Sequence, residues 1–166
     1  MPLARRLITI ALAIVGAALF SVAVQGGRWW DVGSEVHVVV GAPAEGELVR
    51  RIGTERCFGG ECGYGAVAWA GGSSMWERLG VATYVGGQLT ALALLALAGA
   101  VAARRAGRLA AGVVTVAVVT ATAVAIGFHV TAPELPGATL GRAPYLFVGA
   151  VLAAIAAVAS VVTAKR

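Results

Sequence analysis

Four long stretches of this chain contain no charged side chain. They cover residues 7–25, 79–103, 109–129 and 143–164. Each is about as long as the roughly 20 residues that a helix needs to cross the ~30 Å hydrocarbon core of a bilayer. Because lipid offers no hydrogen bonds to a bare backbone, segments this apolar must form their amide bonds internally, as helices. The sequence therefore predicts a membrane all-α four-helix bundle in contact with the lipid bilayer.

The composition leaves room for a single domain. Hydrophobic residues make up 59% of the 166 residues and charged residues only 13%, whereas soluble domains contain about 25% charged residues. Outside the four spans, the chain has a polar segment at 26–76 and a short segment at 130–142. We expect residues 1–166 to form one four-span membrane domain with two outer loops.

The distribution of charge predicts the orientation. The net charge is +5, but the basic residues do not gather in one patch, so we expect no nucleic acid partner. Three segments that flank the spans are basic and contain no acidic residue; their basic residues are Arg5, Arg6, Arg104, Arg105, Arg108, Lys165 and Arg166. By the positive-inside rule, both termini face the cytoplasm. The large loop then lies outside the plasma (cytoplasmic) membrane.

The first apolar stretch has a second interpretation. Arg5 and Arg6 lead an apolar run that ends in small residues near Ala23, which is the order of a secretory signal peptide. The run is longer than the roughly 7 to 15 residues of a signal-peptide core. A retained helix is therefore the favoured interpretation, and cleavage would leave the other three orientations unchanged.

The first outer loop is expected to contain a β-hairpin. Residues 35–40 and 47–52 are rich in β-branched side chains, and turn-forming residues at 41–46 separate them. A third extended piece is expected at 63–69, and one more strand within 131–140. Together they predict a small extracellular antiparallel β-sheet that caps the helices.

Both cysteines of the chain, Cys57 and Cys62, lie in this outer loop. Thiols outside the cytoplasm meet oxidising conditions and tend to pair. Between them, Gly59 and Gly60 can form a tight return that brings the two sulfur atoms together. We expect a structural disulfide, since a redox-active pair is more usually spaced Cys-x-x-Cys.

The remaining polar and aromatic residues indicate anchoring more than chemistry. Tryptophans fall near the expected membrane boundaries, where an indole keeps its N–H in the headgroup region; they are Trp29, Trp30, Trp69 and Trp76. His37 is expected as an exposed imidazole on a strand, and His129 as an interfacial histidine. Two isolated histidines do not make a metal site. No Asp, Glu, Lys or Arg lies inside a span, which disfavours a transporter or pump. We expect no cofactor, no metal and no enzymatic activity.

The order of these features resembles the claudin and PMP22/EMP superfamily of tetraspan proteins, as a distant relative. Trp30 stands where claudins have a tryptophan after span one, and Cys57 and Cys62 stand where they have a cysteine pair. The Leu-Gly at Gly141 and the Tyr-Leu at Tyr145 resemble the start of the fourth claudin span. The Gly-Leu-Trp that precedes the first cysteine in claudins is absent here. The resemblance implies roles in adhesion, in a barrier or as an auxiliary subunit.

The leading hypothesis is a non-enzymatic membrane protein whose outer sheet contacts other proteins. Cys57, Cys62 and Trp30 would hold the sheet, and the segment from Phe58 to Glu61 would provide contact surface together with the strand edges. The expected partner is a second copy of the chain, as a homo-oligomer, or a larger membrane protein.

Two other functions compete with this hypothesis. One is a membrane thiol oxidoreductase that would use the two cysteines with a quinone. The other is a claudin-like pore element, in which acidic loop residues would line an ion route; these are Asp31, Glu35, Glu45 and Glu47. The same acids are more often a solvated loop face.

Overall fold

The structure is a computed structural model of the whole chain. It describes residues 2–25, 27–32, 36–42, 51–58, 61–66, 74–105, 107–134 and 137–165, and it describes their side chains except at 32, 36, 41–42, 51–58, 61–66, 74 and 165.

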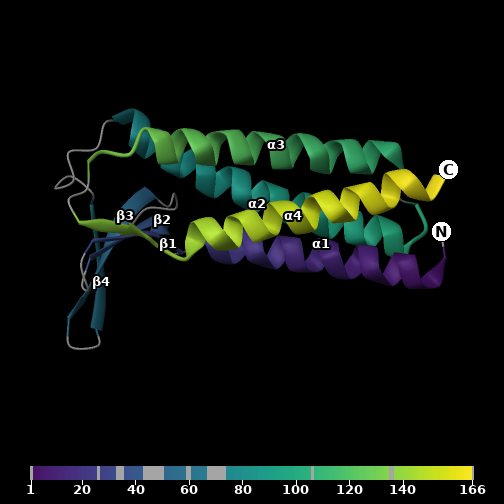
Figure 1. Ribbon diagram of the computed structural model, residues 1–166, viewed down its shortest axis with the longest axis horizontal. Coiled ribbons are helices and arrows are strands. Elements are labelled where there is room, and N and C mark those ends of the chain that lie inside the picture. Colours follow the sequence, from purple (N-terminus) through teal and green to yellow (C-terminus); the bar gives the residue numbers. More distant parts are fainter. Residues whose placement is uncertain are drawn as a thin grey trace.

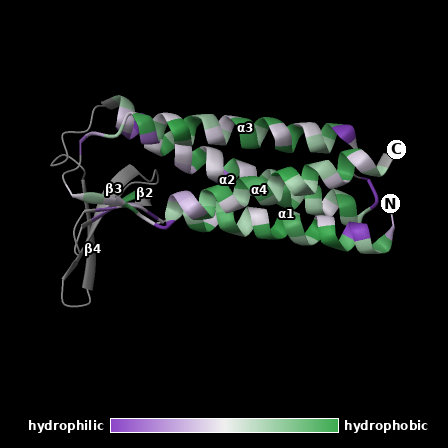
Figure 2. Cartoon of the chain, viewed as in Figure 1, coloured by the Kyte–Doolittle hydropathy of each residue, from purple (hydrophilic) through white to green (hydrophobic). Residues whose placement is uncertain are grey.

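Four long helices run side by side and form the body of the molecule (Figure 1). They are α1 (Leu3–Val24), α2 (Ser74–Ala102), α3 (Arg108–Val130) and α4 (Ala143–Val162), and a short 3-10 turn, η2 (Thr163–Lys165), follows α4. All four are long and apolar enough to cross a membrane. Hydrophobic residues cover most of their length (Figure 2). The helical bundle expected from the sequence is therefore present, and it indicates a multi-pass membrane protein.

Small side chains allow the helices to pack closely. The contacts of α1 with α4 and with α2 are the most extensive, and those between α3 and α4 are the least among the helix pairs that are neighbours. Several alanines of α1 and α4 are fully buried, among them Ala13, Ala150 and Ala154. Lipid tails are as apolar as these side chains, so close packing and hydrogen bonds hold such helices together, not exclusion from water.

Hydroxyl and guanidinium groups add hydrogen bonds between the helices. Thr90 is fully buried in α2 and donates to the carbonyl of Gly86 at 2.7 Å, within its own helix, and to that of Ala117 in α3 at 3.2 Å. Thr9 in α1 and Ser160 in α4 form a hydrogen bond. At the same end of the bundle, Arg6 donates to the carbonyl of Ala102 in α2 at 2.9 Å.

A five-stranded antiparallel sheet lies at the end of the bundle opposite the two termini (Figure 1). Its strands are β1 (Arg28–Val32), β2 (Val36–Ala42), β3 (Arg51–Phe58), β4 (Glu61–Ala66) and β5 (Ala138–Leu140), arranged in the order β4-β3-β2-β1-β5. Pairing of β1 with β5 joins the first outer segment to the second.

The strands partly match those expected. The predicted hairpin corresponds to β2 and β3; β3 overlaps the expected 47–52 at residues 51–52 and continues to Phe58, while residues 47–50 lie outside the described residues. The expected third strand overlaps β4, and β5 lies within 131–140. Strand β1 was not predicted, because Trp29 and Trp30 directly follow a span and were interpreted as membrane anchors.

The close contact of α1 with α2 predicts a penalty for enlarging Gly87. A Cβ atom there would lie 2.7 Å from Cγ1 of Val24, a stiff and fully buried side chain. We expect Gly87→Ala to lower the free energy of unfolding by about 1–3 kcal/mol, the usual cost of overpacking. The measurement is the unfolding midpoint of the purified protein in detergent.

Gly99→Ala is the matched control, since no atom lies within 4 Å of a Cβ at that position in the same helix. Alanine favours helix over glycine by up to about 1 kcal/mol. Equal effects of the two substitutions would contradict the packing described here.

Candidate functional site

An aromatic cluster joins the sheet to the bundle. Trp30 in β1 lies against Phe128 near the end of α3, with ring centroids 5.2 Å apart. Trp76 in the first turn of α2 stacks on the ring of Phe128, with ring centroids 5.6 Å apart. Trp29 contacts Phe128 at 5.4 Å and Phe147 of α4 at 5.9 Å. Ring contacts thereby join this one strand to α2, α3 and α4, with α2 reached through Trp30 and Trp76 at 6.1 Å.

The interpretation of these tryptophans as membrane anchors was wrong for three of them. Trp29, Trp30 and Trp76 are at most 7% exposed, so their rings are inside the protein. The indole N–H of Trp29 donates to the carbonyl of Ala23 at 3.2 Å, not to a headgroup. Burial wins because β1 returns across the helix ends, where the rings gain contact with one another. Trp69 lies outside the described residues.

His129 extends the cluster to the surface. Its ring stacks on that of Trp30, with centroids 5.3 Å apart and planes 6° apart, while the residue remains exposed. It therefore lies in the last turn of α3, at the sheet end of the bundle, against a buried indole.

Gly141 determines how closely the second outer segment approaches the first. Its backbone N–H donates to the carbonyl of Trp29 at 3.0 Å. A Cβ atom at this position would lie 2.3 Å from the carbonyl oxygen of Arg28, so no other residue fits without moving the backbone. Tyr145, the other residue singled out near span four, is 66% exposed on α4.

Asp31 and His37 form a pair that the sequence analysis missed. Nδ1 of His37 lies 2.5 Å from Oδ1 of Asp31, and the two residues face each other across β1 and β2. The expected exposure of His37 was wrong, since the residue is 4% exposed, while the side chain of Asp31 is 31% exposed. Asp31 was considered as a pore or contact charge; in the structure its carboxylate accepts a hydrogen bond from a buried imidazole.

The pair belongs to a row of residues that crosses the sheet. Thr139 of β5 lies opposite Asp31, His37 opposite Glu55 of β3, and Glu55 opposite Tyr64 of β4. Residues directly opposite each other share one face of a sheet. Among the described side chains, no group of three could hold a metal ion.

The register also brings the two cysteine positions together. Cys57 of β3 lies directly opposite Cys62 of β4, and Phe58 lies opposite Glu61. Cα atoms of opposite residues in an antiparallel pair are about 4.5–5.5 Å apart, within the range that a disulfide requires. The expected disulfide remains a prediction that this register favours. Glu35, Glu45 and Glu47 lie outside the described residues.

The Asp31–His37 pair generates a test of the sheet. Removing the carboxylate by Asp31→Ala leaves a buried imidazole without its acceptor, and we expect a loss of about 1–3 kcal/mol in the free energy of unfolding. The double variant Asp31→Ala with His37→Leu should lose less, because no buried polar group is then left unpaired. Denaturation of all variants in one detergent measures the coupling. Additive losses would show that the pair does not interact.

The chain was also compared with known proteins. No model of a known protein family matches it. No curated protein matches it either.

Proposed function

We propose that this chain is a non-enzymatic integral membrane protein whose extracytoplasmic sheet mediates protein–protein contacts, in the manner of claudin-like tetraspan proteins. Both termini and the connection between α2 and α3 would face the cytoplasm. The partner would be a second copy of the chain or a larger membrane protein.

The observation that carries this proposal is the free edge at β4. This strand is last in the sheet order, and within the described part of the chain it pairs only with β3. Figure 1 shows β4 extending away from the helices. An edge strand presents unpaired N–H and C=O groups, which can bind a strand of another chain.

Charge supports the proposed orientation. The two termini lie at the same end of the bundle (Figure 1), and the connection between α2 and α3 lies there too. Arg5, Arg6, Arg104 and Arg105 are at this end, whereas Asp31 is at the sheet end. Positive charge near short loops favours the cytoplasmic side.

The places of Trp30, Cys57 and Cys62 in the fold support the resemblance to tetraspan proteins. Trp30 lies at the start of the sheet and packs onto the bundle, as the resemblance requires of a residue that holds the sheet. A bond between Cys57 and Cys62 would staple the two strands that form the free edge. A stapled edge strand costs less to order when a partner binds it.

Site-specific photo-crosslinking tests the edge directly. A photoreactive amino acid at Gly65, on β4, should capture a protein in native membranes. The same group at Thr54, its opposite on β3 and the same face of the sheet, is the matched control and should capture several-fold less. Mass spectrometry of the product distinguishes a second copy from a different membrane protein. Equal capture at both positions, or none at either, would contradict an edge-mediated contact.

The cysteine pair gives a second test. Cys57→Ser, Cys62→Ser and the double variant should each lose about 2 kcal/mol in the free energy of unfolding, since either change opens the same short loop. All three should also reduce capture at Gly65 to the same degree. Thiol trapping in living cells should find the wild-type pair fully oxidised. A pair that cycles between oxidised and reduced forms would instead favour the thiol oxidoreductase alternative.

A further inference from the structure

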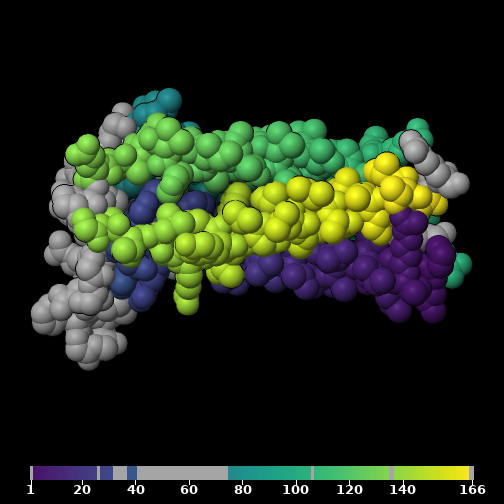
Figure 3. All heavy atoms as spheres, in the orientation of Figure 1, coloured from purple at the N-terminus to yellow at the C-terminus, as the bar shows by residue number. Residues whose placement is uncertain are grey.

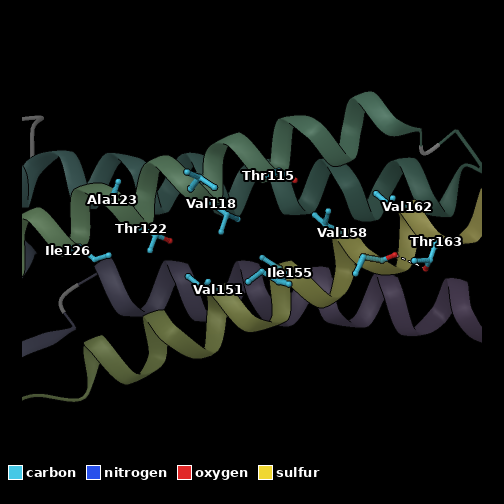
Figure 4. A pocket seen from close by; sticks show the side chains of 13 residues that line it. Thr115, Val118, Thr122, Ala123, Ile126, Val151, Ile155, Val158, Val162 and Thr163 are labelled. Carbon is cyan, nitrogen blue, oxygen red and sulfur yellow. Dashed lines mark hydrogen bonds between the residues drawn. The ribbon is translucent and has the colours of Figure 1, made fainter.

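A groove runs along the outer side of the bundle between α3 and α4, the helix neighbours with the least mutual contact. Its volume is about 720 Å³, and its wall is almost entirely aliphatic. Figure 3 shows α4 lying between α3 and α1 on this face, so α3 and α4 are both at the surface of the bundle here. In Figure 4, Ile126 and Val151 lie toward one end of the groove, and Val162 and Thr163 toward the other.

The α4 side of the groove is about as long as one leaflet is deep. Along α4 it extends from Val151 to Thr163, which is roughly 18 Å at about 1.5 Å per residue. Half of a ~30 Å hydrocarbon core is about 15 Å. On the α4 side the groove therefore runs from near the middle of the helix to the end where both termini lie, which is the depth of one acyl chain. On the α3 side its wall continues to Ile126, near the sheet end.

A positive charge lies at the end of the groove. Arg5 of α1 donates from Nη2 to the hydroxyl of Thr163, which is part of the groove wall. Among the described residues, no acidic side chain belongs to this end of the bundle; Asp31, Glu77 and Glu134 lie at the sheet end. A guanidinium group carries five N–H donors, so it can donate hydrogen bonds to a phosphate as well as to Thr163.

We propose that this groove binds one acyl chain of an anionic glycerophospholipid from the leaflet on the side of the termini, with the lipid phosphate beside Arg5. The chain fills the aliphatic space between α3 and α4, and the headgroup supplies the counter-charge at its end. This site lies at the opposite end of the molecule from the sheet and does not depend on the proposed contact function.

A transmembrane helix of a partner fits the groove less well. The groove has branched side chains along it, including Ile126, Ile155 and Val158, where close helix contacts usually have small residues. A flexible chain can enter between such side chains.

Photolabelling with lipids tests the site. The full chain is reconstituted in bilayers that contain phosphatidylglycerol with a diazirine in one acyl chain, and labelled peptides are identified by mass spectrometry. We expect labels to concentrate on the groove residues of α3 and α4. Ala159→Phe, which fills the groove, should reduce this labelling several-fold. Ala156→Phe is the matched control, because Ala156 is also an exposed alanine of α4 but does not line the groove.

The headgroup is tested separately with Arg5→Gln. In wild type, labelling by phosphatidylglycerol should exceed that by phosphatidylcholine with the same chains by about fivefold, the factor expected for one basic residue beside an anionic lipid. Arg5→Gln should abolish this preference, whereas Arg105→Gln, in the connection between α2 and α3, should keep it. Ala123→Phe, on the α3 side of the groove, replaces Ala159→Phe if the latter does not fold.

Three results would overturn the proposal. They are labels spread evenly over the exposed faces of all four helices, equal labelling of the two alanine variants, and capture of a protein by a photoreactive group at Ala123. The last result would assign the groove to a partner helix.

Discussion

The packing of β1 across the ends of the helices is the contact on which the rest of the outer structure depends. Trp29 and Trp30 follow α1 after a short connection and contact Phe128 of α3, and this fixes the first strand on the bundle. The other strands extend outward from it, with β5 on one side and β2 on the other. Large aromatic rings are suited to this position because each buries much area and packs edge-to-face with its neighbours.

The close approach of backbones makes this junction precise. Gly141 allows the second outer segment to contact β1 where any side chain would clash with the carbonyl of Arg28. Within the bundle, Gly87 leaves room for the side chain of Val24. The two halves of the chain are therefore held together at the sheet end by backbone contact and aromatic packing, while hydroxyl and arginine hydrogen bonds join the helices at the other end.

The two ends of the molecule also differ in what they offer to partners. At the sheet end, β4 is the last strand in the sheet order, and an edge strand offers backbone hydrogen bonds, which suit another polypeptide. At the end of the termini, Arg5 lies beside an aliphatic groove, which suits a lipid. The proposed protein contact and the proposed lipid site would therefore lie toward opposite ends of the helices.

The spans and the existence of a small sheet were predictable, because they depend on local properties: long uncharged runs form helices in lipid, and β-branched residues beside turns form strands. The position of β1 also had a local signal. Val32 and Val36 pair across β1 and β2, and the three residues between them are a common loop length for a hairpin that would place a strand before the predicted one. The burial of Trp30, the Asp31–His37 pair and the groove between α3 and α4 could not. They depend on which segments meet in space. Contacts between residues far apart in the sequence decide this, and no local sequence pattern encodes such contacts.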